Sequence, residues 1–175
     1  MAIPFIRWPE GLSDPLAGTI VDYQAGRARH DWTAAQVTKE ALDRAKAWNG
    51  TLHAVDLFSD TAMDEARASD SRARHQKLRG PLDGVPLFAK SIYDMHGFPT
   101  TASSAEWAKL FPSAVPRDSV EVARMRSAGG VVLGKTPAHG FAVPGHGTSP
   151  PTGQVPHPST PTGVKDPAGP ARRPP

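Results

Sequence analysis

Proline and the aromatic residues are distributed unevenly along this 175-residue chain. Residues 143–175 contain ten of the 19 prolines, whereas all twelve Phe, Trp and Tyr side chains lie at or before Phe141. Ordering a chain costs conformational entropy, which the burial of apolar surface must offset. The first 142 residues therefore have the material for one hydrophobic core. We expect the Pro/Gly-rich C-terminal tail to be disordered or extended.

Charge and cysteine content narrow the class of protein. Twenty basic against 17 acidic residues give a net charge of +3, which is too small by itself to indicate a nucleic-acid surface. The absence of cysteine excludes a disulfide framework, a thiolate metal site and a cysteine nucleophile. No apolar run approaches the roughly 20 residues of a membrane span, and no secretory signal is recognisable. We expect a soluble, cytoplasmic protein without nucleic-acid or membrane partners.

A helix over residues 33–48 is the clearest predicted element. Thr33 and Gln36 have the spacing of a capping box, and apolar residues then recur on one face. Asn49-Gly50 is expected to end this helix. The pattern also predicts strands over 52–58, 85–89 and 131–133, a polar helix from Ser59 or Asp60 to about Leu78, and a helix from Asp118 to Gly129-Gly130. Helices that alternate with short apolar strands indicate an α/β fold.

Lys90 comes directly after the apolar strand predicted over 85–89. An amine at a strand end that is partly desolvated has a lowered pKa and can act as a general base near neutral pH. The alternative is a lysine whose stem packs on the core while its ammonium group stays in water. The pattern alone leaves both interpretations open, and Lys90 is the candidate catalytic residue.

Other polar groups give weaker signals. The hydroxyl-rich stretch 100–104 is typical of a turn that bonds its own backbone. His139 and His146 lie in a Gly/Pro-rich segment without a carboxylate partner, so we predict no metal site. The segment 134–136, Gly-Lys-Thr, has the wrong glycine spacing for a phosphate loop. No cofactor is predicted.

One segment resembles the signature of a known family. It reads Gly-Pro-Leu-Asp-Gly-Val-Pro-Leu-Phe-Ala-Lys over residues 80–90 and continues as Gly-Phe-Pro-Thr-Thr-Ala-Ser-Ser over 97–104. Both blocks resemble the amidase signature family, and residues 118–136 are similar to the segment that follows in those enzymes. The resemblance covers roughly residues 10–153. It implies the N-terminal part, 1–153, of an α/β domain whose mixed sheet is covered by helices and is incomplete here, followed by a Pro-rich tail over 154–175.

The resemblance also implies a reaction. Enzymes of this family hydrolyse carbon–nitrogen bonds of carboxylic amides with a serine, a second serine in a cis peptide bond and a lysine, without metal or cofactor. Lys90 matches that lysine, whose role in the family is to hold or remove the proton of the bridging serine. A small-molecule amide is the implied substrate.

Three departures from the family pattern stand out. The family usually has an acidic residue where this chain has Ser91, and a glycine where it has Ser103. Both catalytic serines lie in a Gly-Gly-Ser-Ser-like stretch that this sequence does not contain. We therefore expect this chain to be inactive by itself. The alternative is a non-catalytic scaffold whose Pro-x-x-Pro motifs, at 158–161 and 167–170, bind a Pro-recognition domain.

The composition of the tail suggests why the serines are missing. Reading residues 165–173 one base out of frame permits the series Arg, Ser or Pro, Gly, Gly, Ser, Ser. Our hypothesis is a single-base insertion or deletion between about residues 153 and 165, and the alternative is a genuine Pro-rich linker. Sequencing the coding DNA tests this: we expect a shifted frame that spells the Gly-Gly-Ser-Ser stretch and continues in family-like sequence. Its absence from both shifted frames would contradict the hypothesis.

Overall fold

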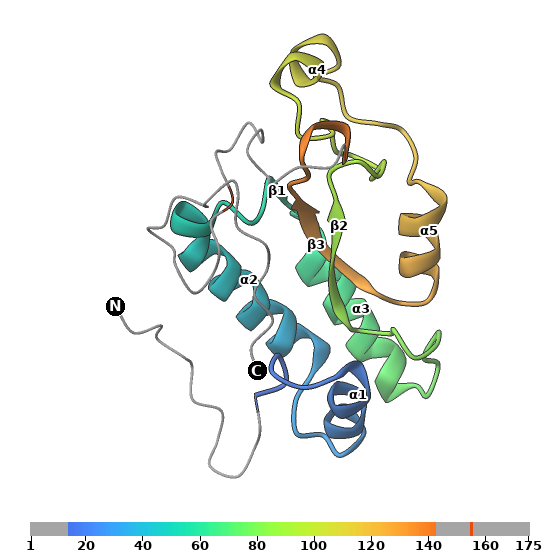
Figure 1. The fold of residues 1–175 in the computed structure, drawn as a ribbon. Coiled ribbons are helices and arrows are strands. Elements are labelled where there is room, and N and C mark those ends of the chain that lie inside the picture. The colour runs from blue at the N-terminus through green and yellow to red at the C-terminus, as the bar shows by residue number, and fades with distance from the viewer. Residues whose placement is uncertain (1–13, 143–154, 156–175) are drawn as a thin grey trace, which may run out of the picture.

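A computed structural model describes residues 14–142 and residue 155 (Figure 1). The division into 1–153 and a Pro-rich tail falls outside those residues and stays a prediction. In chain order the elements are α1 (Ile20–Ala28), α2 (Ala34–Leu52), β1 (Leu57–Phe58), α3 (Ala62–Arg74), β2 (Pro86–Lys90), α4 (Ala105–Leu110), α5 (Val120–Ser127), β3 (Val131–Thr136) and the 3₁₀ helix η1 (Gly140–Ala142). None of the described helices is long and apolar enough to cross a membrane.

The three strands form a mixed sheet in the order β1-β3-β2. β1 runs antiparallel to β3, whereas β2 runs parallel to it, with Pro86 opposite Val131 and Lys90 opposite Thr136. Gly134 is required in β3, because a Cβ atom there would lie 2.1 Å from the carbonyl oxygen of Leu57. The predicted α/β class with a mixed sheet is confirmed.

Helices cover both faces of the sheet (Figure 1). Val131 and Leu133 pack into one core cluster with apolar residues of α2 and α3. Val132 points the other way and packs with Val122 of α5. Successive side chains of a strand alternate between faces, so one short strand serves two layers of core. This explains why the central strand of the sheet is buried almost from end to end.

The start of α2 was predicted correctly and its end was not. Thr33 and Gln36 form the expected reciprocal capping box. The helix nevertheless passes through Asn49 and Gly50 to Leu52. The Asn49 side chain closes the loop after the helix instead, by donating to the carbonyl oxygen of Val55 at 2.9 Å and accepting its N–H at 2.8 Å. The left-handed residue that ends α2 is His53, and Asn49 contributes through its side chain.

Other boundaries also differ from the prediction, and β3 continues to Thr136, past the predicted end at residue 133. The strand expected over 52–58 is reduced to the two residues of β1. α3 begins after Thr61 and ends at Arg74, short of Leu78. α5 is capped by Ser119, whose hydroxyl accepts the N–H of Val122. Asp118, the predicted cap, instead accepts the backbone N–H of His96 at 2.7 Å. The Asp118 side chain therefore bonds to a residue 22 positions earlier in the sequence instead of capping α5.

A buried charged cluster joins the helices to the turn before β2. The Asp83 side chain is fully buried and accepts hydrogen bonds from Arg72 at 2.8 and 2.9 Å, from the backbone N–H of Arg79 at 2.8 Å, and from the Ser69 hydroxyl. Burial acts to raise the pKa of Asp83, but these hydrogen bonds outweigh it and lower the pKa below 3.8. The Asp83 carboxylate is therefore ionised, and Arg27 lies beside it at 3.9 Å.

Asp83→Ala is expected to destabilise the fold strongly, because it leaves the guanidinium group of Arg72 without its anion and Arg27 with Asp70 alone. We expect a loss of roughly 3 to 5 kcal/mol in the free energy of unfolding, measured by urea denaturation at pH 7. Asp64→Ala is the matched control, since Asp64 is exposed and pairs with Arg67 on the surface. That control is expected to change stability by less than about 1 kcal/mol. Equal effects of the two substitutions would contradict this account.

Candidate active site

Lys90 is the last residue of β2 and lies opposite Thr136 at the end of β3. Because these strands are parallel, their carboxyl ends meet at one edge of the sheet, a common position for functional residues in α/β folds. Ala89 before it is only 2% exposed, whereas Lys90 is exposed. The sequence left open whether Lys90 is partly desolvated or keeps its ammonium group in water, and its exposure among the described residues agrees with the second interpretation. Its amine makes no hydrogen bond within that part of the chain.

Ser91, which follows Lys90 in the sequence, and Ser103 form a buried hydrogen-bond network. The hydroxyl oxygens of Ser91 and Ser103 lie 2.8 Å apart, and both residues are almost fully buried. Ser103 Oγ also accepts the N–H of Ala138 at 2.7 Å and donates to Asp56 Oδ2 at 3.3 Å. Since Ser103 has one proton to donate, Ser91 is the donor of the bond between them. This network joins the end of β2 to the loop over 99–104 and to the segment after β3.

The backbone of this loop is unusual at two residues. Ala102 and Ser103 have φ angles of +47° and +54°, in the left-handed region that glycine adopts most easily. The resemblance noted above implies a glycine at position 103, and the left-handed backbone there agrees with that expectation. Ala102 is held by hydrogen bonds with Ser91 and Phe141, at 3.2 and 2.9 Å. The two departures at positions 91 and 103 are thus in direct contact.

A second lysine at this edge is buried. Lys135 is 1% exposed, and its Nζ donates to the carbonyl oxygen of Pro99 at 2.9 Å and to Thr100 Oγ1 at 3.2 Å. Burial lowers its pKa to about 8, although the carboxylates of Asp94 and Asp56 act in the opposite direction. Lys135 was not among the candidate site residues predicted from the sequence. It follows the apolar strand predicted over 131–133 after a single glycine, a signal similar to the one used for Lys90, and the structure places it within β3.

The remaining sequence candidates have structural roles or fall outside the described residues. The stretch 100–104 is a turn, as predicted: Ser103 N–H donates to Thr101 Oγ1 at 3.2 Å, and Ser104 caps α4. His139 is described and His146 is not. Within 14–142 and at residue 155, no three His, Cys, Asp or Glu residues are grouped as metal ligands.

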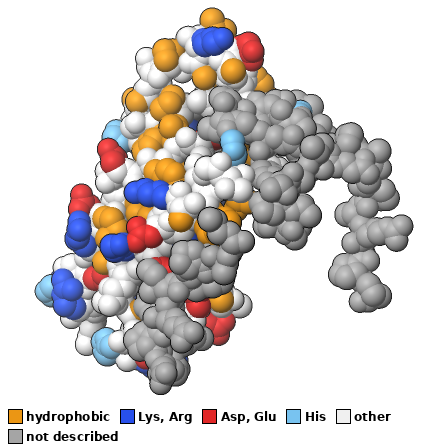
Figure 2. Space-filling model, turned by 90° about the vertical axis from the view of Figure 1, so that its left-hand side faces the viewer, with side chains coloured by type: hydrophobic (Ala, Val, Ile, Leu, Met, Phe, Trp, Pro, Cys, Tyr) orange, Lys and Arg blue, Asp and Glu red, His pale blue; other side chains and the backbone are white. Residues whose placement is uncertain are grey.

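An apolar surface lies on α4 and η1. The ring of Trp107 contacts that of Phe111 in a tilted arrangement, with centroids 4.2 Å apart, and meets Phe141 edge-on at 5.4 Å. All three rings are substantially exposed, as is Leu110. Figure 1 shows α4 beyond the end of the sheet, and Figure 2 shows apolar side chains at the same end of the described surface. Large exposed rings gathered in this way are typical of surfaces that contact a ligand or another segment.

The family of this chain follows from its match to known proteins. The model of the amidase family matches residues 36–165, about three quarters of the sequence. The chain belongs to the amidase family.

Similar proteins agree with this placement. A glutamyl-tRNA(Gln) amidotransferase subunit of Salinispora arenicola is 44% identical over 118 residues, which are 66% of this chain and 23% of that protein. The native peptide amidase of Stenotrophomonas maltophilia is 31% identical, with a TM-score of 0.72 over 82% of this chain and 30% of its own. A vestigial protein complex that reveals the evolutionary origins of an s-triazine catabolic enzyme gives 29% identity and a TM-score of 0.75, over 81% and 31% of the two chains. The chain thus spans between 23% and 31% of the length of these relatives.

Lys135→Met should alter the pH dependence of stability. Lys135 titrates near pH 8 when folded and near 10.5 when unfolded, so between these values the unfolded chain binds more protons. The free energy of unfolding therefore rises with pH, by roughly 2 kcal/mol from pH 8 to 9.5. We expect Lys135→Met to remove that rise in urea denaturation.

The measurement stops at pH 9.5 because burial raises the pKa of Tyr23 above its usual 10.0, which gives the opposite slope at higher pH. Lys90→Met is the matched control, since Lys90 is an exposed lysine at the end of the neighbouring strand. It should leave the rise intact. A Lys135→Met chain that keeps the full rise would show that Lys135 is not its source.

Proposed function

We propose that this chain is the lysine-bearing part of a hydrolase that cleaves the carbon–nitrogen bond of a small-molecule carboxylic amide. The observation that carries the proposal is the position of Lys90, at the carboxyl end of a parallel strand within the signature-like segment 80–90. The amidotransferase and the peptide amidase described above support amide chemistry, because their names describe it. No metal or cofactor enters the proposed reaction.

In the proposed mechanism Lys90 accepts a proton from a bridging serine, which in turn takes the proton of a nucleophilic serine. The nucleophile attacks the amide carbon, and the carbon–nitrogen bond breaks as the proton passes to the departing nitrogen. An acyl-serine remains and is hydrolysed by water. The sequence contains no Gly-Gly-Ser-Ser stretch to supply the two serines. We therefore propose that this chain alone is inactive.

The groups around Lys90 have a positioning role in this proposal. Ser91, next to Lys90, is fixed by Ser103, and Lys135 fixes the loop over 99–104 through Pro99 and Thr100. Both sets of contacts lie at the edge of the sheet where β2 ends with Lys90. A general base must stay within hydrogen-bond reach of the proton that it accepts, so rigid support on the inner side of β2 favours the reaction.

A chimera tests the proposed function. Residues 1–142 are joined to the part of the Stenotrophomonas maltophilia peptide amidase that follows the matching position, and hydrolysis of a peptide amide is measured. We expect no hydrolysis by the 175-residue chain and measurable hydrolysis by the chimera. Lys90→Ala in the chimera should lower kcat at least roughly a hundredfold, as loss of a general base does. Lys77→Ala, which removes an exposed lysine before β2, is the matched control and should change kcat less than about twofold.

Two results would contradict the proposal. Amide hydrolysis by the 175-residue chain alone, lost on Lys90→Ala, would show that the missing serines are dispensable. A chimera that remains fully active with Lys90→Ala would show that this lysine has no part in proton transfer. The scaffold alternative makes a separate prediction, namely that a peptide of residues 154–175 binds a Pro-recognition domain.

A further inference from the structure

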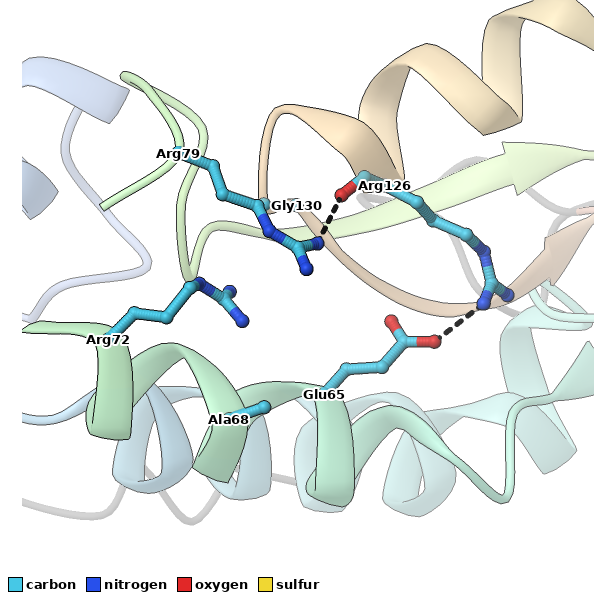
Figure 3. Close-up of a pocket in the computed structure, with 7 residues that line it drawn as sticks. Glu65, Ala68, Arg72, Arg79, Arg126 and Gly130 are labelled. Carbon is cyan, nitrogen blue, oxygen red and sulfur yellow. Dashed lines mark hydrogen bonds and ion pairs between the residues drawn. The ribbon is translucent and has the colours of Figure 1, made fainter. Parts of the chain in front are cut away.

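A surface cavity of about 260 Å³ lies at the other end of the sheet from Lys90. It is lined by three arginine side chains, by Glu65 and by small residues that include Ala68 and Gly130 (Figure 3). The cavity opens where β2 and β3 begin, since Gly84 N–H donates to the carbonyl oxygen of Gly129 just before both strands. The first four residues of β2 lie between the cavity and Lys90. At roughly 3.3 Å per residue, the cavity is distinct from the candidate active site.

The carboxylates at the cavity already have their hydrogen bonds. Glu65 Oε1 accepts Arg126 Nη1 at 2.7 Å, and Glu65 Oε2 accepts the backbone N–H of Val132 at 3.0 Å. Both carboxylate oxygens of Asp83 likewise accept hydrogen bonds, from Nε and Nη2 of Arg72. These anions hold the fold together and have little remaining capacity to neutralise further guanidinium groups.

Two guanidinium groups at the cavity retain donors. Arg72 uses Nε and Nη2 on Asp83, and its Nη1 has no hydrogen bond within the described part of the chain. Arg79 makes a single side-chain hydrogen bond, from Nη1 to the carbonyl oxygen of Arg126 at 3.3 Å. Among residues 14–142 no carboxylate lies within ion-pair distance of Arg79. Figure 3 shows both guanidinium groups extending into the same space above Ala68.

We propose that this cavity binds a phosphate group between the guanidinium groups of Arg72 and Arg79. Guanidinium groups match the geometry of phosphate oxygens, and a phosphate has enough acceptor oxygens to be shared by two arginines from different segments. Arg126 is paired with Glu65 and Arg72 with Asp83, so Arg79 carries the one charge at the lining that no carboxylate of residues 14–142 compensates. The small side chain of Ala68 leaves room for the anion. The ligand is inorganic phosphate or a small phosphate monoester.

Binding is tested on the full 175-residue chain by titration with inorganic phosphate, followed by ³¹P NMR and by the thermal unfolding temperature. Sodium chloride keeps the ionic strength constant, because exposed arginines bind anions weakly through general attraction. Arg79→Ala is the test variant, since the hydrogen bond from its backbone N–H to Asp83 is retained. Arg74→Ala is the matched control, because Arg74 is exposed on the same helix as Arg72 and does not line the cavity.

We expect saturable phosphate binding that raises the unfolding temperature. Arg79→Ala should raise the Kd about tenfold or more, whereas Arg74→Ala should leave it within about twofold. Glycerol phosphate in a second titration distinguishes the two sources of the group: tighter binding than inorganic phosphate indicates a monoester ligand. Absence of saturable binding would overturn the proposal. Equal weakening by the two substitutions, or equal binding of acetate, would also overturn it, since general attraction of anions explains either result.

Discussion

The described structure depends on a buried arrangement of two carboxylates and two guanidinium groups. Asp83 and Asp70 share Arg27, and Arg72 completes the set from α3. Asp70 also accepts the first two free N–H groups of α2, from Ala34 at 2.7 Å and from Ala35 at 3.0 Å. One cluster thus joins three helices to the turn that leads into β2. Such a cluster tolerates loss of a member poorly, because each charge is compensated within it.

Close packing around this cluster sets where β2 begins. Gly129, just after α5, has a φ angle of +88°, and a Cβ atom there would lie 2.6 Å from the Asp83 side chain. Only glycine therefore allows the backbone to approach the carboxylate this closely. Gly84 N–H then bonds to Gly129, which sets β2 beside β3. The carboxyl end of β2 is held separately, by Ser91 and the loop over 99–104. Lys90 is therefore positioned from both ends of a short strand.

Signals that act over a few residues predicted much of this structure. The capping box at Thr33, the strand that ends in Lys90 and the helix end at Gly129 each depend on neighbours within about four positions, and each was found. The extra cap of α2 by Asp70 comes from 36 residues away, and no periodic pattern encodes it. The burial of Lys135 has the same cause, because its partners belong to a distant loop. The signature-like segment predicted the family, which local patterns did not.

The contact between Ser91 and Ser103 has a consequence for how this site changes in evolution. Each residue differs from the usual family pattern, and each provides the other with a hydrogen-bond partner in a place that water does not reach. Replacing Ser103 by glycine alone would leave the Ser91 hydroxyl buried without that partner, which costs free energy. The two positions are therefore epistatic. A lineage that exchanges one of them passes through a less stable intermediate, so related sequences should carry this serine pair together or lack both members.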